Sequence, residues 1–303
     1  MAERAKLAAR ALHVDVSNFF LLQYRSVDGY MITGKNSGTH WLKFMLSHAF
    51  AEEFNLPPPQ HSSGASSDEF IGHPKWPQKH PQAPRIGSSH NLPSALLSNP
   101  ALFHALRLPP IVVLVRDPKE AMLSAYVKWR DETGFTLADY VMARPHGKRR
   151  ISDIWWYIEF FNRWGQMAMR LPEEVLIVRY EDLMSEPAYW LRRVLAHYGV
   201  DVSEASVGAA VKASGKSRMR RLLDPNFNET IIPIQAERNA ARFSPAEEAA
   251  LHDVLSAHLK FSFGYGYAAG NRPMVISRPD VAIGAEAGAE EAPPTTASRR
   301  SVG

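Results

Sequence analysis

Three short runs of apolar, mostly β-branched residues constrain the fold more than any other feature of this chain. They occupy residues 30–33, 111–115 and 175–178. Each run has the length of a strand and is bounded by turn or helix-start residues, which is typical of a strand buried on both faces of a parallel sheet. Each run is also followed by a helix signal. This alternation predicts an α/β fold in which helices flank a central parallel sheet on both faces.

The helix signals that follow the three runs have recognisable limits. Residues 41–54 carry apolar residues at helical spacing. Pro118 suits the first turn of a helix that Asp117 would cap and that would end near residue 130. Residues 153–171 predict another helix, and their many aromatic side chains indicate that it lies in the core.

Composition divides the chain into three parts. We expect residues 1–28 to form a lead-in, residues 29–270 to form a single domain, and residues 271–303 to form a disordered tail. Residues 57–100 are interrupted by prolines, glycines and serines. A loop of that length is usually functional or disordered, and we expect a functional one.

Cysteine is absent from the 303 residues, and the formal net charge is +4. The lack of cysteine excludes disulfides, thiolate catalysis and zinc sites with cysteine ligands, and it fits a reducing compartment. The positive charge suits an anionic ligand or polymer and equally suits simple solubility. The sequence has no run of about 18 apolar residues, and residues 1–16 lack the apolar centre of a secretory signal. We therefore expect a cytoplasmic protein without a membrane span.

A candidate phosphate-binding loop lies in residues 34–41, which read GKNSGTHW. Small residues let the backbone turn tightly where a strand meets a helix, so that several N–H groups can point at one anion. A helix start without any ligand fits the same residues. The spacing G-x-x-x-x-G-K from Gly29 to Lys35 also matches a nucleotide-triphosphate loop. However, Gly29 precedes the strand, and Asn36 stands where a magnesium-binding Ser or Thr is required.

Two further strand ends carry polar side chains. Arg116 follows the second run, and Ser124 lies about two turns into the next helix. A guanidinium fork and a hydroxyl suit a phosphate monoester, although Arg116 could instead pair with a nearby carboxylate. Tyr180 follows the third run and could offer its ring edge or hydroxyl to a base.

In this order, the elements resemble the family of sulfotransferases that depend on 3′-phosphoadenosine 5′-phosphosulfate (PAPS). The resemblance rests on the strings SGTHW at 37–41, RDP at 116–118 followed by Ser124, and RYEDL at 179–183. It implies that the first string lies in a P-loop-like phosphosulfate-binding loop, and that Arg116 and Ser124 bind the 3′-phosphate. The residues that the resemblance assigns to the donor are Lys35, Asn36, Ser37, Gly38, Thr39, His40, Trp41, Arg116, Ser124, Tyr180 and Arg238.

His90, within SSHNLP at 88–93, is similar to the catalytic histidine of that family. The resemblance implies that His90 is the general base and that Lys35 neutralises the leaving phosphate. It further implies sulfuryl transfer to a hydroxyl or amine of a small-molecule or glycan acceptor, with no metal ion, and an acceptor-binding role for residues 57–100. The other histidines near His90 in sequence are His61, His73, His80 and His104.

The chain departs from the family pattern at several positions. Asn36 stands where the family has a lysine, Ser88 stands where the family often has another, and Asn91 interrupts the string His-Leu-Pro. Arg238 is the nearest candidate for the C-terminal basic residue, and the basic residues at 212–221 are an alternative. A kinase that phosphorylates a small molecule, a binding module for anionic polymers and an inactive homologue remain alternatives. We expect no nucleic-acid partner, and the oligomeric state stays open.

Overall fold

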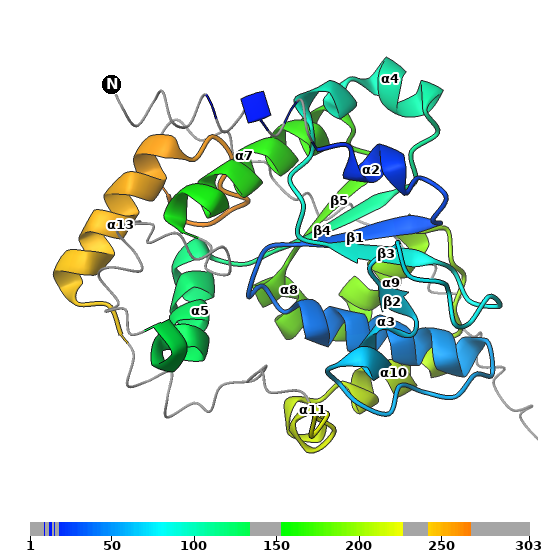
Figure 1. The fold of residues 1–303 in the computed structure, drawn as a ribbon. Helices are drawn as coiled ribbons and strands as arrows, with labels where there is room; N and C mark the ends of the chain where they lie inside the picture. The colour runs from blue at the N-terminus through cyan, green and yellow to red at the C-terminus, as the bar shows by residue number, and fades with distance from the viewer. Residues whose placement is uncertain are drawn as a thin grey trace, which may run out of the picture.

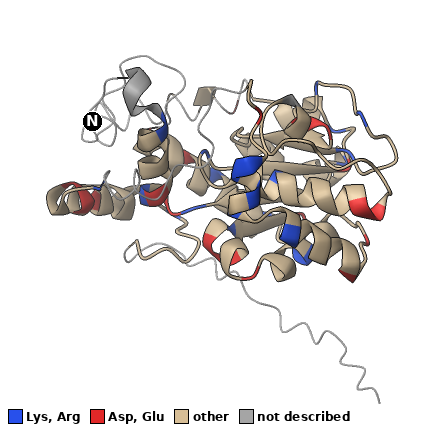
Figure 2. Ribbon diagram, turned by 90° about the horizontal axis from the view of Figure 1, so that it is seen from below, with Lys and Arg blue, Asp and Glu red and all other residues tan. Residues whose placement is uncertain are grey.

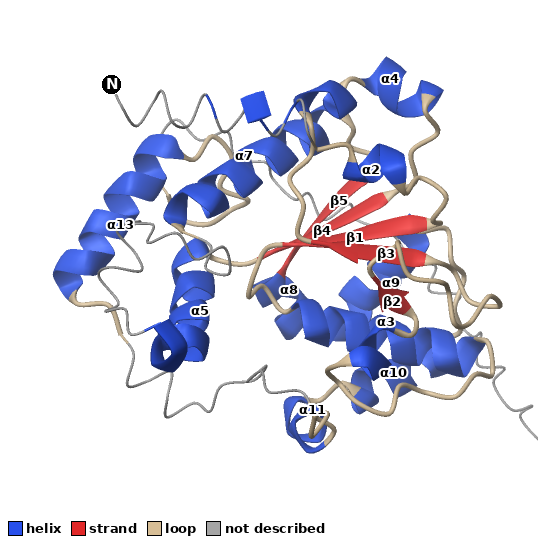
Figure 3. Ribbon diagram, viewed as in Figure 1, coloured by secondary structure: helices blue, strands red, loops and turns tan. Residues whose placement is uncertain are grey.

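A computed structural model describes residues 18–133, 153–226 and 242–267, together with Ala9, Leu12, His13 and Asp15. Five parallel strands form one sheet between layers of helices (Figures 1 and 3). The strands are β1 (Gly29–Thr33), β2 (Ile71–Gly72), β3 (Ile86–Ser89), β4 (Ile111–Val115) and β5 (Val175–Arg179). Their order across the sheet is β2-β3-β1-β4-β5. The predicted α/β class with a parallel central sheet is confirmed.

Helices connect and follow these strands. In chain order the described helices are α2 (Phe20–Gln23), α3 (Thr39–Glu53), the 3-10 helix η1 (Ala65–Asp68), the 3-10 helix η2 (Ala95–Ser98), α4 (Pro100–Ala105), α5 (Pro118–Thr133), α7 (Ile154–Arg170), α8 (Tyr180–Ser185), α9 (Pro187–His197), α10 (Glu204–Ala213), α11 (Lys216–Arg221) and α13 (Pro245–His258).

The sheet is buried on both faces because alternate strand residues enter two different cores. On β1, Tyr30 and Ile32 pack with α7 and α13, whereas Met31 packs with α3, α9 and α10. On β4, Val113 lies in the first core and Val112 in the second. The apolar runs lack a polar alternation for this reason.

The three strands and three helices predicted from the sequence are present. Residues 30–33, 111–115 and 175–178 lie in β1, β4 and β5, and the predicted helices correspond to α3, α5 and α7. Asp117 accepts a hydrogen bond from the N–H of Lys119 at 2.8 Å, which confirms its place at the start of α5. Asp153 caps α7 in the same way through the N–H of Trp156.

Residues 57–100 are not a single loop, because they contain η1, β2, β3 and η2. β3 was missed because Ile86 is followed by Gly87 and two serines, which carry no strand signal. Gly87 lies tightly against Pro74, where an added Cβ would stand 3.2 Å from the proline Cβ. Close packing between β2 and β1, rather than local propensity, makes this segment a strand.

The described helices carry Lys and Arg interspersed with Asp and Glu (Figure 2). No helix in the described ranges combines the length and the apolar content needed to cross a bilayer. The expected disordered tail at 271–303 lies outside the described residues.

Candidate active site

Four neighbouring strands end at one edge of the sheet because all of their pairings are parallel. β3 leads into His90, β1 into the loop 34–38, β4 into Arg116 and β5 into Tyr180. The three predicted strand ends therefore meet in space, and the strand that was not predicted brings His90 to the same edge.

The loop 34–38 turns through two residues with left-handed backbone. Asn36 has a φ of 56° and Gly38 a φ of 92°. Asn and Gly tolerate this region better than other residues, which accounts for an asparagine at position 36. Gly38 precedes α3, and the first turn of α3 carries no acidic residue. Because the first N–H groups of a helix lack partners within it, this turn is suited to hold an anion.

Two side chains hold the loop through its carbonyl groups. The hydroxyl of Tyr157 on α7 donates to the carbonyl of Lys35 at 3.0 Å, and Nη1 of Arg116 donates to the carbonyl of Asn36 at 3.1 Å. Burial raises the pKa of Tyr157, so its hydroxyl stays protonated and remains a donor. These two hydrogen bonds tie the carbonyl groups of Lys35 and Asn36 to α7 and to the end of β4, and so hold the loop in shape without a ligand.

Tyr180 forms the floor beneath the start of α3. An added Cβ at Gly38 would stand 2.5 Å from Cδ2 of Tyr180, so only glycine fits there. The rings of Trp41 and Tyr180 meet edge to face with their centroids 5.7 Å apart. The guanidinium of Arg116 lies 4.8 Å from the Tyr180 centroid. Nε1 of Trp41 also donates to the carbonyl of Ser214 at 3.0 Å, which joins the segment before α11 to the site.

Positive charge approaches the loop from two sides. Arg116 is only 7% exposed, and its Nη2 lies 3.4 Å from Oε2 of Glu120. Ser124, half-buried on α5, lies one helical turn beyond Glu120 on the same side of the helix. On the other side of the loop, Nζ of Lys35 lies 5.2 Å from the ring centroid of Trp156 on α7. The sequence leaves open whether Arg116 binds a phosphate or pairs with a nearby carboxylate, and the structure shows a contact with the carboxylate of Glu120.

His90 is oriented by Thr33, the last residue of β1. Nδ1 of His90 lies 2.7 Å from the carbonyl oxygen and 3.0 Å from the hydroxyl of Thr33. A carbonyl only accepts, so Nδ1 carries the hydrogen and Nε2 keeps its lone pair. His90 is an exposed residue, yet the protein around its ring lowers its pKa to about 4, chiefly by desolvation, and nearby lysines lower it further. His90 is therefore neutral near pH 7.

The other residues predicted to bind the donor differ in their burial and in their contacts. Ser37 is buried, and the hydroxyl of Thr39 lies 2.8 Å from the hydroxyl of Thr33. Nδ1 of His40 is buried without a hydrogen-bond partner among the described residues. Burial lowers the pKa of His40 to about 3, so its ring adds no positive charge. Arg238 lies outside the described residues.

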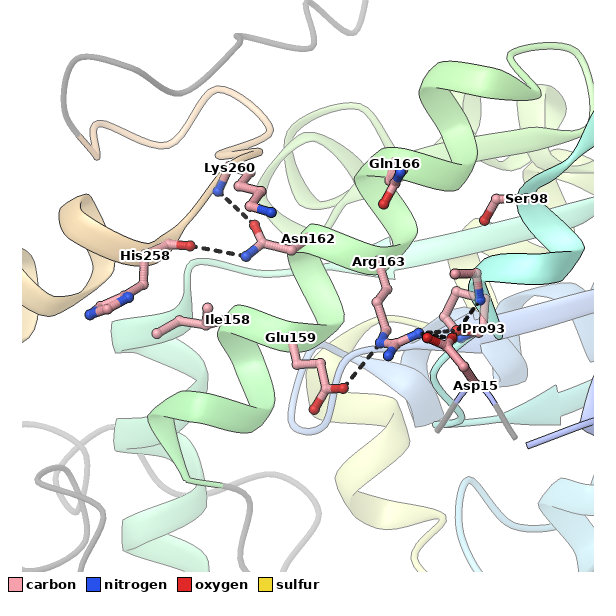
Figure 4. A pocket seen from close by; sticks show the side chains of 11 residues that line it. Asp15, Pro93, Ser98, Ile158, Glu159, Asn162, Arg163, Gln166, His258 and Lys260 are labelled. Atoms are coloured by element: carbon pink, nitrogen blue, oxygen red, sulfur yellow. Dashed lines mark hydrogen bonds and ion pairs between the residues drawn. The ribbon is translucent and has the colours of Figure 1, made fainter. Parts of the chain in front are cut away.

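A cavity of about 440 Å³ lies beside α7 and is also lined by the segment 93–98 and the end of α13 (Figure 4). Its wall includes Arg163, which pairs with Asp15 and Glu159. It also includes Asn162, whose amide donates to the carbonyl of His258, the last residue of α13, and accepts the N–H of Lys260. Pro93 also lines it, but none of the residues 34–41 does. This cavity is separate from the loop that the sequence predicts as the donor site.

Sequence reasoning missed two residues of the site. Thr33 was read only as part of a strand, although a hydroxyl residue directly before the loop is a usable signal. Tyr157 was hidden among the aromatic residues of α7, and only the fold reveals that its hydroxyl reaches the loop.

Comparison with known proteins agrees with the fold described above. A sequence profile described as the sulfotransferase domain matches residues 28–244. No curated protein gives a match. A crystal structure of a mouse sulfotransferase complexed with PAP has a TM-score of 0.55 and 17% identity, covering 82% of this chain and 92% of that chain. Retinol dehydratase, in complex with androsterone and the inactive cofactor PAP, has a TM-score of 0.51 and 13% identity, covering 83% of this chain and 84% of its own. The profile spans well over half of the sequence, and the chain therefore belongs to the sulfotransferase domain family.

Proposed function

We propose that this chain transfers a sulfuryl group from PAPS to a hydroxyl or amine of a small molecule, with His90 as the general base. The observation that carries the proposal is the contact between His90 and Thr33. It leaves Nε2 of His90 able to accept a proton, next to the loop that is built to hold an anion. PAP, the name of the ligand in both similar structures, is the desulfated product of PAPS.

The donor would lie across the strand ends. The N–H groups of the turn that precedes α3 would hold the 5′-phosphosulfate, with the residues from Lys35 to Thr39 around it. Arg116 and Ser124 would bind the 3′-phosphate, and Trp41 and Tyr180 would border the adenine. The chain provides aromatic rings for a base and cations for phosphates at one sheet edge.

The proposed reaction is an in-line displacement at sulfur. The acceptor oxygen or nitrogen forms a bond to sulfur while Nε2 of His90 takes its proton. The bond between sulfur and the bridging oxygen of the 5′-phosphate breaks, and its electron pair stays on that oxygen. Lys35 and the N–H groups of the loop neutralise the charge that develops there. Asn36 takes no charged part in this scheme.

A small-molecule acceptor is favoured by the surface beside Lys35. Trp156 lies against the Lys35 ammonium group and stacks on Phe160 with centroids 5.0 Å apart. Phe160 is buried and supports the half-buried indole of Trp156, which suits contact with an acceptor that has an apolar body. A glycan, which also stacks on indole rings, is the competing class.

The kinase alternative depended on the spacing from Gly29 to Lys35, and the fold places Gly29 in a strand rather than in a phosphate-binding loop. Gly29 is the first residue of β1, and an added Cβ there would stand 2.4 Å from Cδ1 of Tyr198. Packing against Tyr198 thus accounts for this glycine without any phosphate. The mixed charges on the described helices likewise give little support to a polymer-binding module.

Transfer of radiolabelled sulfate from PAPS tests the proposal directly. Phenols, aliphatic alcohols, amines and glycans are offered in parallel, with purified His90→Ala as the control. We expect labelled product from at least one small-molecule class and almost none with the variant. Labelling of glycans alone would correct the acceptor class, and equal labelling by the variant would remove His90 from the mechanism.

A further inference from the structure

The last described segment of the chain, residues 259–267, folds back toward the strand ends. Phe261 packs against Gly165 of α7, where an added Cβ would stand 2.3 Å from Cγ of the ring. Phe263 is fully buried. Its φ of 51° lies in the left-handed region, which a phenylalanine rarely adopts. Packing of these two rings fixes the course of the backbone, and so fixes the two buried tyrosines that follow, Tyr265 and Tyr267.

Both tyrosines donate to carboxylates at the ends of β4 and β5. The hydroxyl of Tyr265 lies 2.5 Å from Oε2 of Glu181, and that of Tyr267 lies 2.6 Å from Oδ1 of Asp117. Oε1 of Glu181 also accepts the backbone N–H of Asp117 at 3.3 Å. We call these four residues the tyrosine–carboxylate bridge. It is continuous from one strand end to the next.

The phenols of the bridge remain donors at any physiological pH. Burial is the main cause that raises the pKa of Tyr265 and of Tyr267, and the negative charges of Glu181 and Asp117 raise these pKa values further. A hydrogen bond from a neutral phenol to a carboxylate is charge-assisted and stronger than a bond between neutral groups. Each phenol therefore fixes the position of its carboxylate.

The bridge fixes two residues that directly follow proposed donor-binding residues in the sequence. Asp117 directly follows Arg116, and Glu181 directly follows Tyr180. The guanidinium of Arg116 in turn lies over the ring of Tyr180. Any shift of β4 relative to β5 at this end would move Arg116 and Tyr180 apart. The bridge resists that shift because its hydrogen bonds join the residues that follow β4 to those that follow β5.

We propose that Tyr265 and Tyr267 are positioning residues for the donor site, acting through Glu181 and Asp117 on Tyr180 and Arg116. The proposal rests on the proposed function, because it takes Arg116 and Tyr180 as donor contacts. The phenols also engage two carboxylates that would otherwise stand close to a polyanionic nucleotide. Without them, Glu181 or Asp117 could turn toward Arg116 and compete with the 3′-phosphate.

The test compares PAP affinity in Tyr265→Phe, Tyr267→Phe and the double variant by isothermal titration calorimetry. We expect about tenfold weaker binding in the double variant, since each change removes a hydrogen bond to a charged group. In steady-state kinetics the KM for PAPS should rise by a similar factor, with kcat and the KM for the acceptor nearly unchanged. A change in kcat without a change in the donor KM would overturn the positioning role.

Tyr198→Phe is the matched control, because Tyr198 is also buried and its hydroxyl donates to the carbonyl of Tyr30 near the opposite end of β1. It should lower thermal stability less than Tyr265→Phe does, because its acceptor is an uncharged carbonyl, and should leave PAP affinity within twofold of the wild type. If the double variant does not fold, a double-mutant cycle of Tyr265→Phe with Glu181→Ala replaces it. The affinity losses in this cycle should not add.

The outcomes separate this proposal from the proposed function. If the wild type binds PAP and the tyrosine variants bind it equally well, the bridge has no positioning role. Additive losses in the double-mutant cycle would also overturn it. If the folded wild type does not bind PAP, the proposed function fails and the role of the bridge fails with it.

Discussion

Nδ1 of His90 lies 2.7 Å from the carbonyl oxygen of Thr33, so the end of β1 orients a side chain that follows β3. The register explains how this contact arises, because Ile32 pairs with Ser89 and the next residues of the two strands are Thr33 and His90. The strand that orients the proposed base also begins the anion-binding loop. A shift of one residue in this pairing would turn His90 away, since successive strand residues face opposite sides.

Replacement of His90 by alanine should lower turnover about 10²–10⁴-fold, the usual contribution of a general base. PAP affinity should change by less than threefold, because the imidazole is not placed on the nucleotide. Steady-state rates and calorimetry measure the two quantities. His61→Ala, which changes another histidine of the 57–100 segment, serves as the control and should keep normal turnover. Near-normal turnover in His90→Ala would contradict the assignment.

The pH dependence follows from the lowered pKa of His90, which is about 4 in the free protein. A base acts when deprotonated, so kcat/KM should be flat from pH 6 upward and should fall only as pH approaches that pKa. NMR titration of the His90 ring measures it. Bound PAP should raise this pKa through its negative charge. A free-protein pKa at or above the 6.5 of an ordinary histidine would contradict the described surroundings.

Gly38→Ala should abolish detectable PAP binding and destabilise the fold. Alanine in left-handed backbone costs about 1–2 kcal/mol, and the new Cβ would also clash with Tyr180 at 2.5 Å. Urea unfolding and calorimetry measure the two effects. Gly208→Ala is the matched control, because an added Cβ there meets nothing within 4 Å and the residue lies inside α10. That variant should gain up to ~1 kcal/mol with normal PAP binding. Normal PAP binding by Gly38→Ala would show that the loop does not need this turn.

Tyr157→Phe should weaken PAP binding several-fold, because the loop loses the donor to its Lys35 carbonyl. Phenylalanine keeps the ring packing of α7, so thermal stability should fall by only about 1 kcal/mol. Tyr30→Phe removes a hydroxyl that donates to the carbonyl of Leu21, far from the loop, and should leave PAP binding unchanged. Equal PAP affinities in the two variants would mean that Tyr157 does not organise the loop.

Fold stability should decrease as pH falls below 6.5 because His40 and His48, like His90, resist protonation in the folded chain. Burial lowers the pKa of His40 to about 3 and that of His48 to about 4, from 6.5 in the unfolded chain. Between those values the unfolded chain binds protons that the folded chain does not, which costs up to ~1.4 kcal/mol per pH unit for each histidine. Urea unfolding from pH 7.5 to 5 measures the slope. His48→Gln should reduce that slope, and an unchanged slope would exclude His48 as a source of it.

The sequence predicted the three neighbouring strands β1, β4 and β5 and missed β2 and β3 on the other side of the sheet. β1, β4 and β5 are continuous apolar runs because both faces of each strand are buried, and such runs are readable without a structure. β2 and β3 are short and contain glycine, and they are strands only because neighbouring strands offer hydrogen bonds. His90 was identified by its resemblance to a family motif, whereas its partner Thr33 could not be found without the register.

The loop 34–38 was likewise predictable only in part. Its position was predictable from Gly34, Gly38 and the helix that follows. The side chains that hold it come from α7 and β4, at separations of 122 residues for Tyr157 and 80 residues for Arg116. No local sequence pattern predicts contacts between residues so far apart in the chain. The same holds for Tyr265 and Tyr267, whose partners lie 84 and 150 residues earlier in the chain.

Calorimetric titration with PAP and, in parallel, with adenosine 5′-monophosphate tests most directly whether this sheet edge recognises a nucleotide charged at both its 3′ and 5′ ends. The two ligands differ only in the 3′-phosphate that Arg116 and Ser124 would bind. We predict at least tenfold tighter binding of PAP, and loss of that preference in Arg116→Ala. Equal binding of the two nucleotides, or no binding of PAP by folded protein, would contradict the proposed donor site.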